Sequence, residues 1–387
     1  MQQNLPNTGI ILSGGGARAA YQVGVLKAVY EQIPKGSHHP FPIICGSSAG
    51  AINAAAIACY AGQFRAGLRR LEKIWTNLSV DQVFESHFSG LFSQAAGFLW
   101  HIITGKSAEK HNALLDNTPL WSLLEKSIPF QRLDKLVQEG LLQALCITCS
   151  DYYSGDSYSF YQGHKDIKSW KRHRRLGVAD KLKLEHLMAS SAIPLIFPPV
   201  QIDAQYFGDG SVGCMSPISP AIHLSADKIM IIGLDPIQSE AGYICYDLPP
   251  PGFADVAGHV LDTVFIDSLD SDLERLQRIN YTLDSIPKEL MEQVNLPLKS
   301  IDTLVIAPSE DLSVIATEYA RYLPKSTKFF MSRLGVDYKH GSHVLSYILF
   351  EGEYCKRLIQ LGYDDTHNRM NEVKEFFNLN QSDNSEQ

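Results

Sequence analysis

Residues 43–50 have the sequence Ile-Ile-Cys-Gly-Ser-Ser-Ala-Gly, and the predicted fold is built around them. Their apolar start predicts a short buried strand, and the small residues from Ala49 to Tyr60 predict a helix directly after it. Between them, Gly46-Ser47-Ser48-Ala49-Gly50 fits the G-x-S-x-G nucleophile elbow, in which a strained turn projects the central hydroxyl. At a helix start, Ser48 would also lie beside unpaired N–H groups that favour a developing negative charge. A plain Gly/Ser-rich turn is the alternative for this window alone.

A second glycine-rich turn precedes this one. Residues 8–13 (Thr-Gly-Ile-Ile-Leu-Ser) predict a buried strand, Gly14-Gly15-Gly16 follow it, and a helix is expected from Ala17 to Tyr30. Three successive glycines leave bare backbone amides that can approach a substrate oxygen closely, and a preorganised donor pair of this kind stabilises a transition state by about 3–4 kcal/mol. Arg18, which is always charged, can brace the loop or hold an anionic group.

Phosphate binding is the competing interpretation of this glycine loop. A P-loop needs Gly-Lys-Ser/Thr after its glycines, and none follows here; a dinucleotide-binding turn needs a third glycine where Ala19 stands. Because Ser48 is expected only one strand away, an oxyanion hole explains the loop better than a phosphate cradle.

Phe207-Gly208-Asp209-Gly210 is the third window with chemical potential, and it follows an extended segment. A carboxylate between glycines in a tight turn can be held within hydrogen-bonding distance of a hydroxyl, to accept its proton or to orient it. Asp-Gly is also the commonest signal of a hairpin turn, and in isolation the hairpin is the better interpretation.

The remaining segments extend the same pattern. Strand, helix, strand and helix alternate within the first ~60 residues, which is typical of a right-handed parallel unit. Residues 62–135 show no clear strand, so an insertion over the sheet is expected there, and apolar spacings of three to five predict one long helix from Val256. Further strands are predicted at residues 141–153, 157–161, 200–207, 227–234 and 301–307.

The composition restricts the class of protein. The 387 residues are 45% hydrophobic, and 34 Lys+Arg against 42 Asp+Glu give a net charge of −8. Such a chain is a poor candidate for nucleic-acid binding, which depends on clustered cations. Residues 1–7 lack the cations and apolar stretch of a secretory signal, and no window reaches about 18 uninterrupted apolar residues. We therefore expect a cytoplasmic protein, soluble or peripherally attached at the inner membrane surface.

Seven cysteines without a secretory signal predict reduced thiols. Cys146 and Cys149 have the spacing of a redox or zinc motif. They fall on a predicted strand, however, where residues three apart point to opposite faces and cannot share one ion. We expect both to be structural thiols.

Together, three windows resemble the patatin-like phospholipase family, and their order and wide separation argue against coincidence. They are Ser13-Gly-Gly-Gly-Ala-Arg18, Gly46-Ser-Ser-Ala-Gly50 and Asp209-Gly210. The resemblance is to bacterial members and covers roughly residues 8–62 and 185–236, including the flanking residues 21–26, 190–199 and 217–222. One departure is Ala19, because the family usually has glycine after the arginine.

The resemblance implies a Ser–Asp dyad that cleaves acyl esters of lipids or phospholipids through an acyl-enzyme, without a catalytic histidine, metal or cofactor. Carried over to this chain, Ser48 is the nucleophile and Asp209 its base or orienting group. The loop Gly14, Gly15 and Gly16 supplies the oxyanion hole, above all through the last two amides. The supporting residues are Arg18, Gly46, Gly50 and Gly210.

The same resemblance implies a three-layer α/β hydrolase of patatin type, with a mostly parallel central sheet and additional C-terminal helices. The expected organisation is a catalytic domain at residues 8–236 with a helical insertion at about 62–135, a mostly helical section at 250–377 packed on it, and a disordered tail at 378–387. A lipid or phospholipid substrate is the expected partner. The oligomeric state is not predictable from the sequence.

Alternative mechanisms stay open at this stage. A downstream histidine can complete a Ser-Asp-His triad, and the candidates are His223, His259, His343 and His367. The absence of a His-Gly-Gly-Gly loop and the early position of the elbow disfavour that order. An acyltransferase, or a catalytically silent lipid-binding scaffold, would share the same fold.

Two segments are candidates for membrane contact. Residues 168–175 contain five cations and Trp170, and they fit either anionic lipid headgroups or a solvated loop. Residues 88–103 are rich in large apolar side chains and fit a lid, an interfacial helix or core packing.

Overall fold

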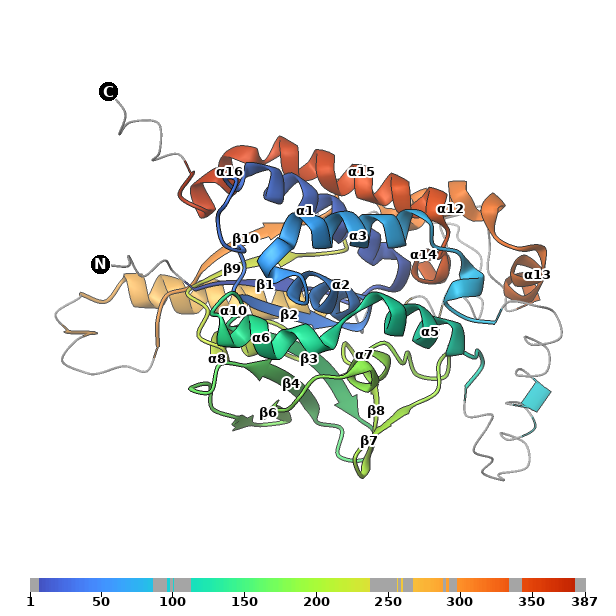
Figure 1. Cartoon of the computed structure of the whole chain (residues 1–387), viewed down its shortest axis with the longest axis horizontal. Coiled ribbons are helices and arrows are strands. Elements are labelled where there is room, and N and C mark those ends of the chain that lie inside the picture. Colours follow the sequence, from blue (N-terminus) through green and yellow to red (C-terminus); the bar gives the residue numbers. More distant parts are fainter. Residues whose placement is uncertain are drawn as a thin grey trace, which may run out of the picture.

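The structure is a computed structural model that describes residues 7–85, 113–236, 267–287, 298–333 and 343–379, together with residues 96, 97, 100, 256, 259, 290 and 291. A single twisted sheet forms its centre, with helices on both faces (Figure 1). The strands are β1 (Thr8–Leu12), β2 (Ile43–Ser47), β3 (Ala144–Asp151), β4 (Ser157–Gly163), β5 (Trp170–Arg172), β6 (Arg175–Ala179), β7 (Val200–Ile202), β8 (Gln205–Asp209), β9 (Lys228–Ile232) and β10 (Asp302–Ile306).

The sheet order is β10-β9-β1-β2-β3-β4-β6-β5, and β8 pairs with both β3 and β7. The five strands from β10 to β3 run parallel, as expected for strands that are buried on both faces and linked by helices. The turns after β1 and β2 therefore lie side by side at the carboxyl edge of the sheet. Antiparallel pairing of β8 with β3, with Asp209 opposite Cys149, brings the Asp209 turn to the same edge.

Helices cover the two faces of the sheet unequally (Figure 1). The larger core cluster combines one face of β1 and β9 with apolar residues of α1, α2, α3, α7 and α15, and the smaller cluster combines the other face with α8 and α10. The helices and 3₁₀ turns are η1 (Gly16–Ala19), α1 (Ala20–Gln32), α2 (Ser48–Ala58), η2 (Ala61–Gln63), α3 (Phe64–Thr76), η3 (Val80–Gln82), α5 (Thr118–Ser127), η4 (Phe130–Arg132), α6 (Leu133–Gln138), α7 (Leu184–Ser190), α8 (Ser219–His223), α10 (Asp267–Asp284), α12 (Leu312–Tyr319), η5 (Ala320–Tyr322), α13 (Lys325–Arg333), α14 (His343–Ile348), α15 (Gly352–Asn368) and α16 (Met370–Phe376).

Most sequence-predicted elements are confirmed. The strands of the first ~60 residues, the hairpin of β3 and β4, and the last strand β10 all lie where the apolar patterns predict them. The described residues of the predicted insertion, 62–85 and 113–135, are helical or irregular, and most of residues 86–112 lie outside the described residues. The long helix expected from Val256 is described as α10 from Asp267 onward, and residues 380–387 of the expected tail lie outside the described residues.

The segment 168–175 differs from the solvated loop that its charge favours. Residues 170–172 form β5, residues 175–179 form β6, and the two pair antiparallel at the edge of the sheet. Trp170 is only 9% exposed and stacks between Tyr161 and His223, with ring centroids 5.3 and 4.8 Å away. The burial of this aromatic ring outweighs the tendency of its charged neighbours to stay in solvent.

Helices α1 and α15 pack closely against each other, and glycines make this possible (Figure 1). A Cβ on Gly24 would lie 1.9 Å from the Ile359 carbonyl oxygen, and one on Gly362 would lie 2.2 Å from the Tyr21 oxygen. Backbone atoms cannot move aside as a flexible side chain can. The C-terminal helix is thus fixed against the helix that follows the glycine loop.

We predict that Gly24→Ala lowers the free energy of unfolding by about 2 kcal/mol or more, because the added methyl overpacks the contact between α1 and α15. Urea denaturation measures the change. The control is Gly233→Ala, whose new Cβ would meet its nearest neighbour, Ala307 Cβ, at an ordinary 3.5 Å. Equal stabilities of the two variants would contradict the close approach.

Candidate active site

Ser48 occupies the turn between β2 and α2 as the first helical residue, in a backbone conformation that side chains rarely adopt. Its φ is +52°, in the left-handed region, and its side chain is buried with 2% exposure. A left-handed non-glycine residue is strained, and such strain concentrates at functional sites. Gly50 allows the tight turn, because a Cβ there would lie 2.1 Å from the Leu12 carbonyl oxygen at the end of β1. Gly46 similarly faces the backbone of the first turn of α2.

The Ser48 hydroxyl donates a hydrogen bond of 2.6 Å to Oδ2 of Asp209, across 161 residues of sequence. The other carboxylate oxygen, Oδ1, accepts the Ser211 N–H at 2.9 Å, and Asp209 is fully buried at the end of β8. Burial raises the pKa of Asp209 to about 7, while the hydrogen bonds from Ser48 and Ser211 oppose this shift. A buried carboxyl with a pKa near neutrality, in contact with a hydroxyl, is suited to accepting a proton.

Ser190 links the two segments that meet at this hydrogen bond. Its hydroxyl accepts the Ser48 N–H at 2.9 Å and donates to the Thr148 carbonyl of β3 at 2.6 Å, and its own carbonyl accepts the Gly210 N–H at 3.1 Å. Position 210 requires glycine, because the backbone of β3 lies so close that a Cβ there would be 1.8 Å from the Thr148 carbonyl oxygen. The individual windows do not single out Ser190, although it begins one of the family-like stretches.

The glycine loop lies beside the elbow at the carboxyl edge of β1. Gly16 has a φ of +55°, and a Cβ on it would lie 2.1 Å from the Tyr347 carbonyl oxygen. Among the described residues, none accepts a hydrogen bond from the N–H groups of Gly14, Gly15 or Gly16. Gly16 and Ser48 line the same pocket, so the glycine loop lies on the side of the nucleophile elbow.

Arg18 is buried, with 1% exposure, and connects the glycine loop to α14. Its Nε donates to Ser346 Oγ at 2.7 Å, Nη1 contacts the Asp235 carboxylate at 3.1 Å, and its guanidinium lies 4.0 Å from the centroid of the Tyr347 ring. These contacts use the planar, multidentate character of the guanidinium. Arg18 therefore braces the loop and does not extend into solvent toward an anionic group.

A narrow apolar pocket with a cavity volume of about 60 Å³ opens beside Ser48 on the α2 face of the sheet. Along α2 it is lined by Ala49 and by Ser48, Ile52 and Ala56, and the last three are spaced by four residues, which places them on one side of the helix. The rest of its wall comes mainly from apolar side chains of α3, α5 and the segment after α7, including Leu71, Ile74, Trp75, Leu120, Leu123, Leu124, Ile193 and Phe197. Its apolar lining suits a hydrocarbon chain.

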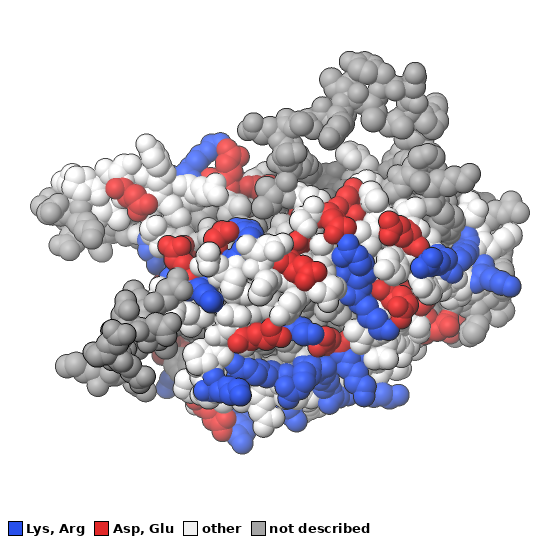
Figure 2. Space-filling model, turned by 90° about the horizontal axis from the view of Figure 1, so that it is seen from above, with Lys and Arg blue, Asp and Glu red and all other residues white. Residues whose placement is uncertain are grey.

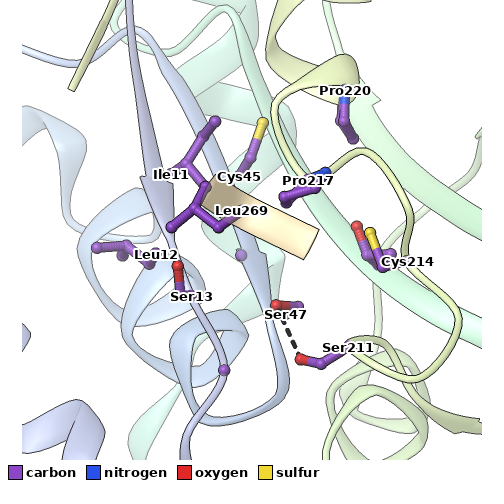
Figure 3. Close-up of a pocket in the computed structure, with 13 residues that line it drawn as sticks. Ile11, Leu12, Ser13, Cys45, Ser47, Ser211, Cys214, Pro217, Pro220 and Leu269 are labelled. Carbon is purple, nitrogen blue, oxygen red and sulfur yellow. Dashed lines mark hydrogen bonds between the residues drawn. The ribbon is translucent and has the colours of Figure 1, made fainter. Parts of the chain in front are cut away.

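A second pocket lies on the other side of the elbow, toward α10 (Figure 3). Figure 3 shows the Ser47 and Ser211 hydroxyls at one end, where the Ser211 hydroxyl donates to Ser47 Oγ at 3.3 Å, and Leu269 near the other end. Ser13 and Gly14 contribute to the same lining. The elbow thus separates an apolar pocket from a smaller pocket with a polar rim.

The four candidate triad histidines do not join the site. None of the described histidines forms a hydrogen bond with Ser48 or Asp209. His223 stacks on Trp170, and His367 stacks on Tyr363. Burial, with further contributions from Arg172 and Arg175, lowers the pKa of His223 to about 4.

The two cysteines with motif spacing lie on β3 with opposite orientations, as predicted. Cys146 belongs to the core cluster on the α10 side of the sheet and Cys149 to the cluster on the α2 side. Burial, together with the nearby Asp209 carboxyl, raises the pKa of Cys149. Within the described residues, no three His, Cys, Asp or Glu side chains are grouped as metal ligands.

The fold and the elbow define an α/β protein of patatin type. A family profile described as Patatin-like phospholipase matches residues 10–222, more than half of the chain, and the chain belongs to this family. Membership implies lipid acyl hydrolase activity in general.

The search of curated proteins gives no match. Among solved structures, VipD from Legionella pneumophila aligns with 13% identity and a TM-score of 0.35, over 95% of this chain and 67% of VipD. No helix among the described residues is long and apolar enough to span a membrane.

We predict that Asp209→Asn raises the thermal stability of the protein, and increasingly so at higher pH. An unfolded aspartate titrates near 3.8 and the folded one near 7, so between these values the unfolded state loses a proton that the folded state retains. Ionisation therefore favours unfolding of the wild type as the pH rises, and asparagine removes this effect. Melting temperatures measured from pH 4 to pH 8 test it; a difference that shrinks with pH would contradict it.

Proposed function

We propose that the protein is a serine acyl hydrolase that cleaves lipid or phospholipid acyl esters through a Ser48–Asp209 dyad. The observation that carries this proposal is the 2.6 Å hydrogen bond from the strained, buried Ser48 hydroxyl to Asp209 beside an apolar pocket. A hydroxyl is a weak nucleophile unless an adjacent base removes its proton, and Asp209 is the residue in position to do so.

In the proposed reaction, Ser48 Oγ attacks the ester carbonyl carbon while its proton passes to Asp209. The negative charge develops on the carbonyl oxygen and is stabilised by the unpaired amides of the glycine loop and by the N-terminus of α2. Collapse of this intermediate breaks the bond to the leaving alcohol, which takes the proton from Asp209, and leaves an acyl group on Ser48. Water, deprotonated by Asp209, then attacks the acyl carbon. The bond from this carbon to Ser48 Oγ breaks, Oγ takes the proton back from Asp209, and the fatty acid leaves.

Three features support a two-residue mechanism. The pKa of Asp209 near 7 makes it a stronger base than an exposed aspartate, its second oxygen is held by the Ser211 N–H, and Ser190 fixes the backbone of the elbow. The Ser48 N–H already donates to Ser190, so Ser48 itself adds no amide to the N-terminus of α2, and the amides of Gly14, Gly15 and Gly16 are the main donors in the proposal.

The apolar pocket supports an acyl chain as the bound half of the substrate. Ser48 and Ala56 are eight residues apart on one side of α2, which corresponds to about 12 Å along the helix axis. This length accommodates a medium-length chain whose carboxyl carbon lies at Ser48.

We predict that Ser48→Ala and Asp209→Asn each lower kcat/KM for a nitrophenyl ester by at least about a thousandfold, because each removes one half of the dyad. Circular dichroism confirms folding. Ser47→Ala is the matched control, since the adjacent serine contacts Ser211 and not Asp209, and its kcat/KM should stay within about tenfold of wild type.

In the wild type, kcat/KM should rise with pH around 7, as Asp209 ionises.

The histidine alternative is tested by the variants His223→Gln, His259→Gln, His343→Gln and His367→Gln, made one at a time. Each should retain most of the wild-type activity. A folded variant that lost activity as completely as Ser48→Ala would replace the dyad by a triad, and wild-type turnover in Ser48→Ala would remove the proposal altogether.

We predict that Ala56→Phe changes the chain-length preference by filling the far end of the apolar pocket. Hydrolysis of a dodecanoate ester should fall about tenfold or more, because several methylenes lose their binding site, while hydrolysis of an acetate ester should change little. Ala56→Ser, which adds little volume, is the control. Equal losses for acetate and dodecanoate would show that the pocket does not hold the chain.

A further inference from the structure

The outer surface of α3, α5 and η4 carries a concentration of cations. We call this the cationic face and define it by Arg65, Arg69, Arg70, Lys73, Lys126 and Arg132. All are exposed except Arg65, which is half-buried. Figure 2, seen from above, shows Lys and Arg gathered in a band along its lower border. This border is the side that faces the viewer in Figure 1, where α3, α5 and α6 lie.

These cations are not neutralised by the part of the protein that the structure describes. None of the six forms an ion pair with a carboxylate of a described residue, whereas the neighbouring Lys27 and Lys135 pair with Glu72 and Glu139. Arg70 instead donates to the Lys126 carbonyl at 3.1 Å. Hydrogen bonds to carbonyl groups leave the positive charge uncompensated. The exposed acid of α5, Glu125, forms no ion pair with any of the six cations.

The cationic face and the apolar pocket are two sides of the same helices. Leu71, Ile74 and Trp75 of α3 line the pocket, while Arg69, Arg70 and Lys73 point outward from the same turns. On α5, Leu123 and Leu124 line the pocket and Lys126 is exposed. Because the apolar sides of these helices face the interior and their cations face outward, whatever binds the cations lies over the helices that wall the pocket.

The guanidinium groups of the face are also anchored over aromatic rings. Those of Arg132 and Arg70 lie 4.6 and 5.9 Å from the centroid of the Tyr60 ring. Trp121 and Phe130 are half-buried on α5 and η4, the elements that carry Lys126 and Arg132. Aromatic rings with one apolar and one wetted side favour the boundary between headgroups and acyl chains.

We propose that the cationic face binds an anionic lipid bilayer and orients the pocket helices on it. Each Lys or Arg near an anionic surface contributes about fivefold to the partition coefficient. Because the chain has a net charge of −8, such a bilayer repels the molecule as a whole, and a surface of clustered cations is the preferred side of attachment. This inference concerns attachment only and stands apart from the chemistry at Ser48.

The cations of β5 and β6 form the rival surface, and the structure disfavours it. Lys168, Lys171, Arg172 and Arg174 are exposed at the edge of the sheet, where β5 and β6 are separated from β2, the strand before the elbow, by β3 and β4. Trp170 is buried in a stack and is not available for insertion into a bilayer. This rival provides a matched control of equal charge.

The test is co-sedimentation of the full chain with lipid vesicles. One set of vesicles contains phosphatidylcholine alone, and the other also contains phosphatidylglycerol. All proteins carry Ser48→Ala, so that the vesicles stay intact. We expect binding to the anionic vesicles only, decreasing with added salt. A quadruple variant of the cationic face should lower the partition coefficient at least about thirtyfold. It combines Arg69→Gln, Arg70→Gln, Lys73→Gln and Lys126→Gln. The control variant of the β5–β6 edge should lower the partition coefficient less than about threefold. It combines Lys168→Gln, Lys171→Gln, Arg172→Gln and Arg174→Gln.

Three outcomes would overturn the proposal. Equal losses in the two quadruple variants would indicate attraction by overall charge, and a larger loss in the β5–β6 variant would assign binding to that edge. No binding of the parent protein to anionic vesicles would leave an acidic protein as the partner of the face. With Ser48 restored, the first quadruple variant should hydrolyse a soluble acetate ester at the wild-type rate, which separates a failure of attachment from a failure of catalysis.

Discussion

A carboxyl group without access to water, held against a serine hydroxyl, is the interaction on which the site depends. No Lys or Arg among the described residues pairs with Asp209, so burial disfavours its ionised form, and the hydrogen bonds from Ser48 and Ser211 partly compensate for this. The fold therefore accepts a destabilised carboxylate where a neutral side chain would be more stable. Such a trade of stability for reactivity is common at active sites.

The architecture around this interaction serves to hold three turns within a few ångströms of one another. Parallel strands β1 and β2 end side by side, β8 pairs with β3 from the opposite direction, and Ser190 ties the elbow to both β3 and the Asp209 turn. Arg18 extends this support to α14, so that the C-terminal part of the chain holds the glycine loop. Helices α2, α3 and α5 then form the pocket against which the elbow opens.

Local sequence signals predict the turns but not the contacts between them. Glycine spacing and apolar strands identify the elbow, the glycine loop and the Asp209 turn, because each depends on backbone conformation encoded within about ten residues. Ser190, which binds the Ser48 amide, lies 142 residues away in sequence, and Ser346, which binds Arg18, lies 328 residues away. No periodicity in these segments specifies either contact. The pocket could not be predicted for the same reason, since its wall combines α2 with two helices of an insertion whose packing only the tertiary fold determines. Residues 170–179 show the reverse case, where charge suggests a loop and the burial of Trp170 produces strands.

Direct detection of the acyl-enzyme tests the central claim most closely. The wild-type protein, mixed with a nitrophenyl dodecanoate and quenched in acid within the first turnovers, should carry one dodecanoyl group on the peptide that contains Ser48, as read by mass spectrometry. The adduct should be absent when Asp209 is asparagine. A dodecanoyl group on another residue, or an undiminished Ser48 adduct without the Asp209 carboxylate, would contradict the account.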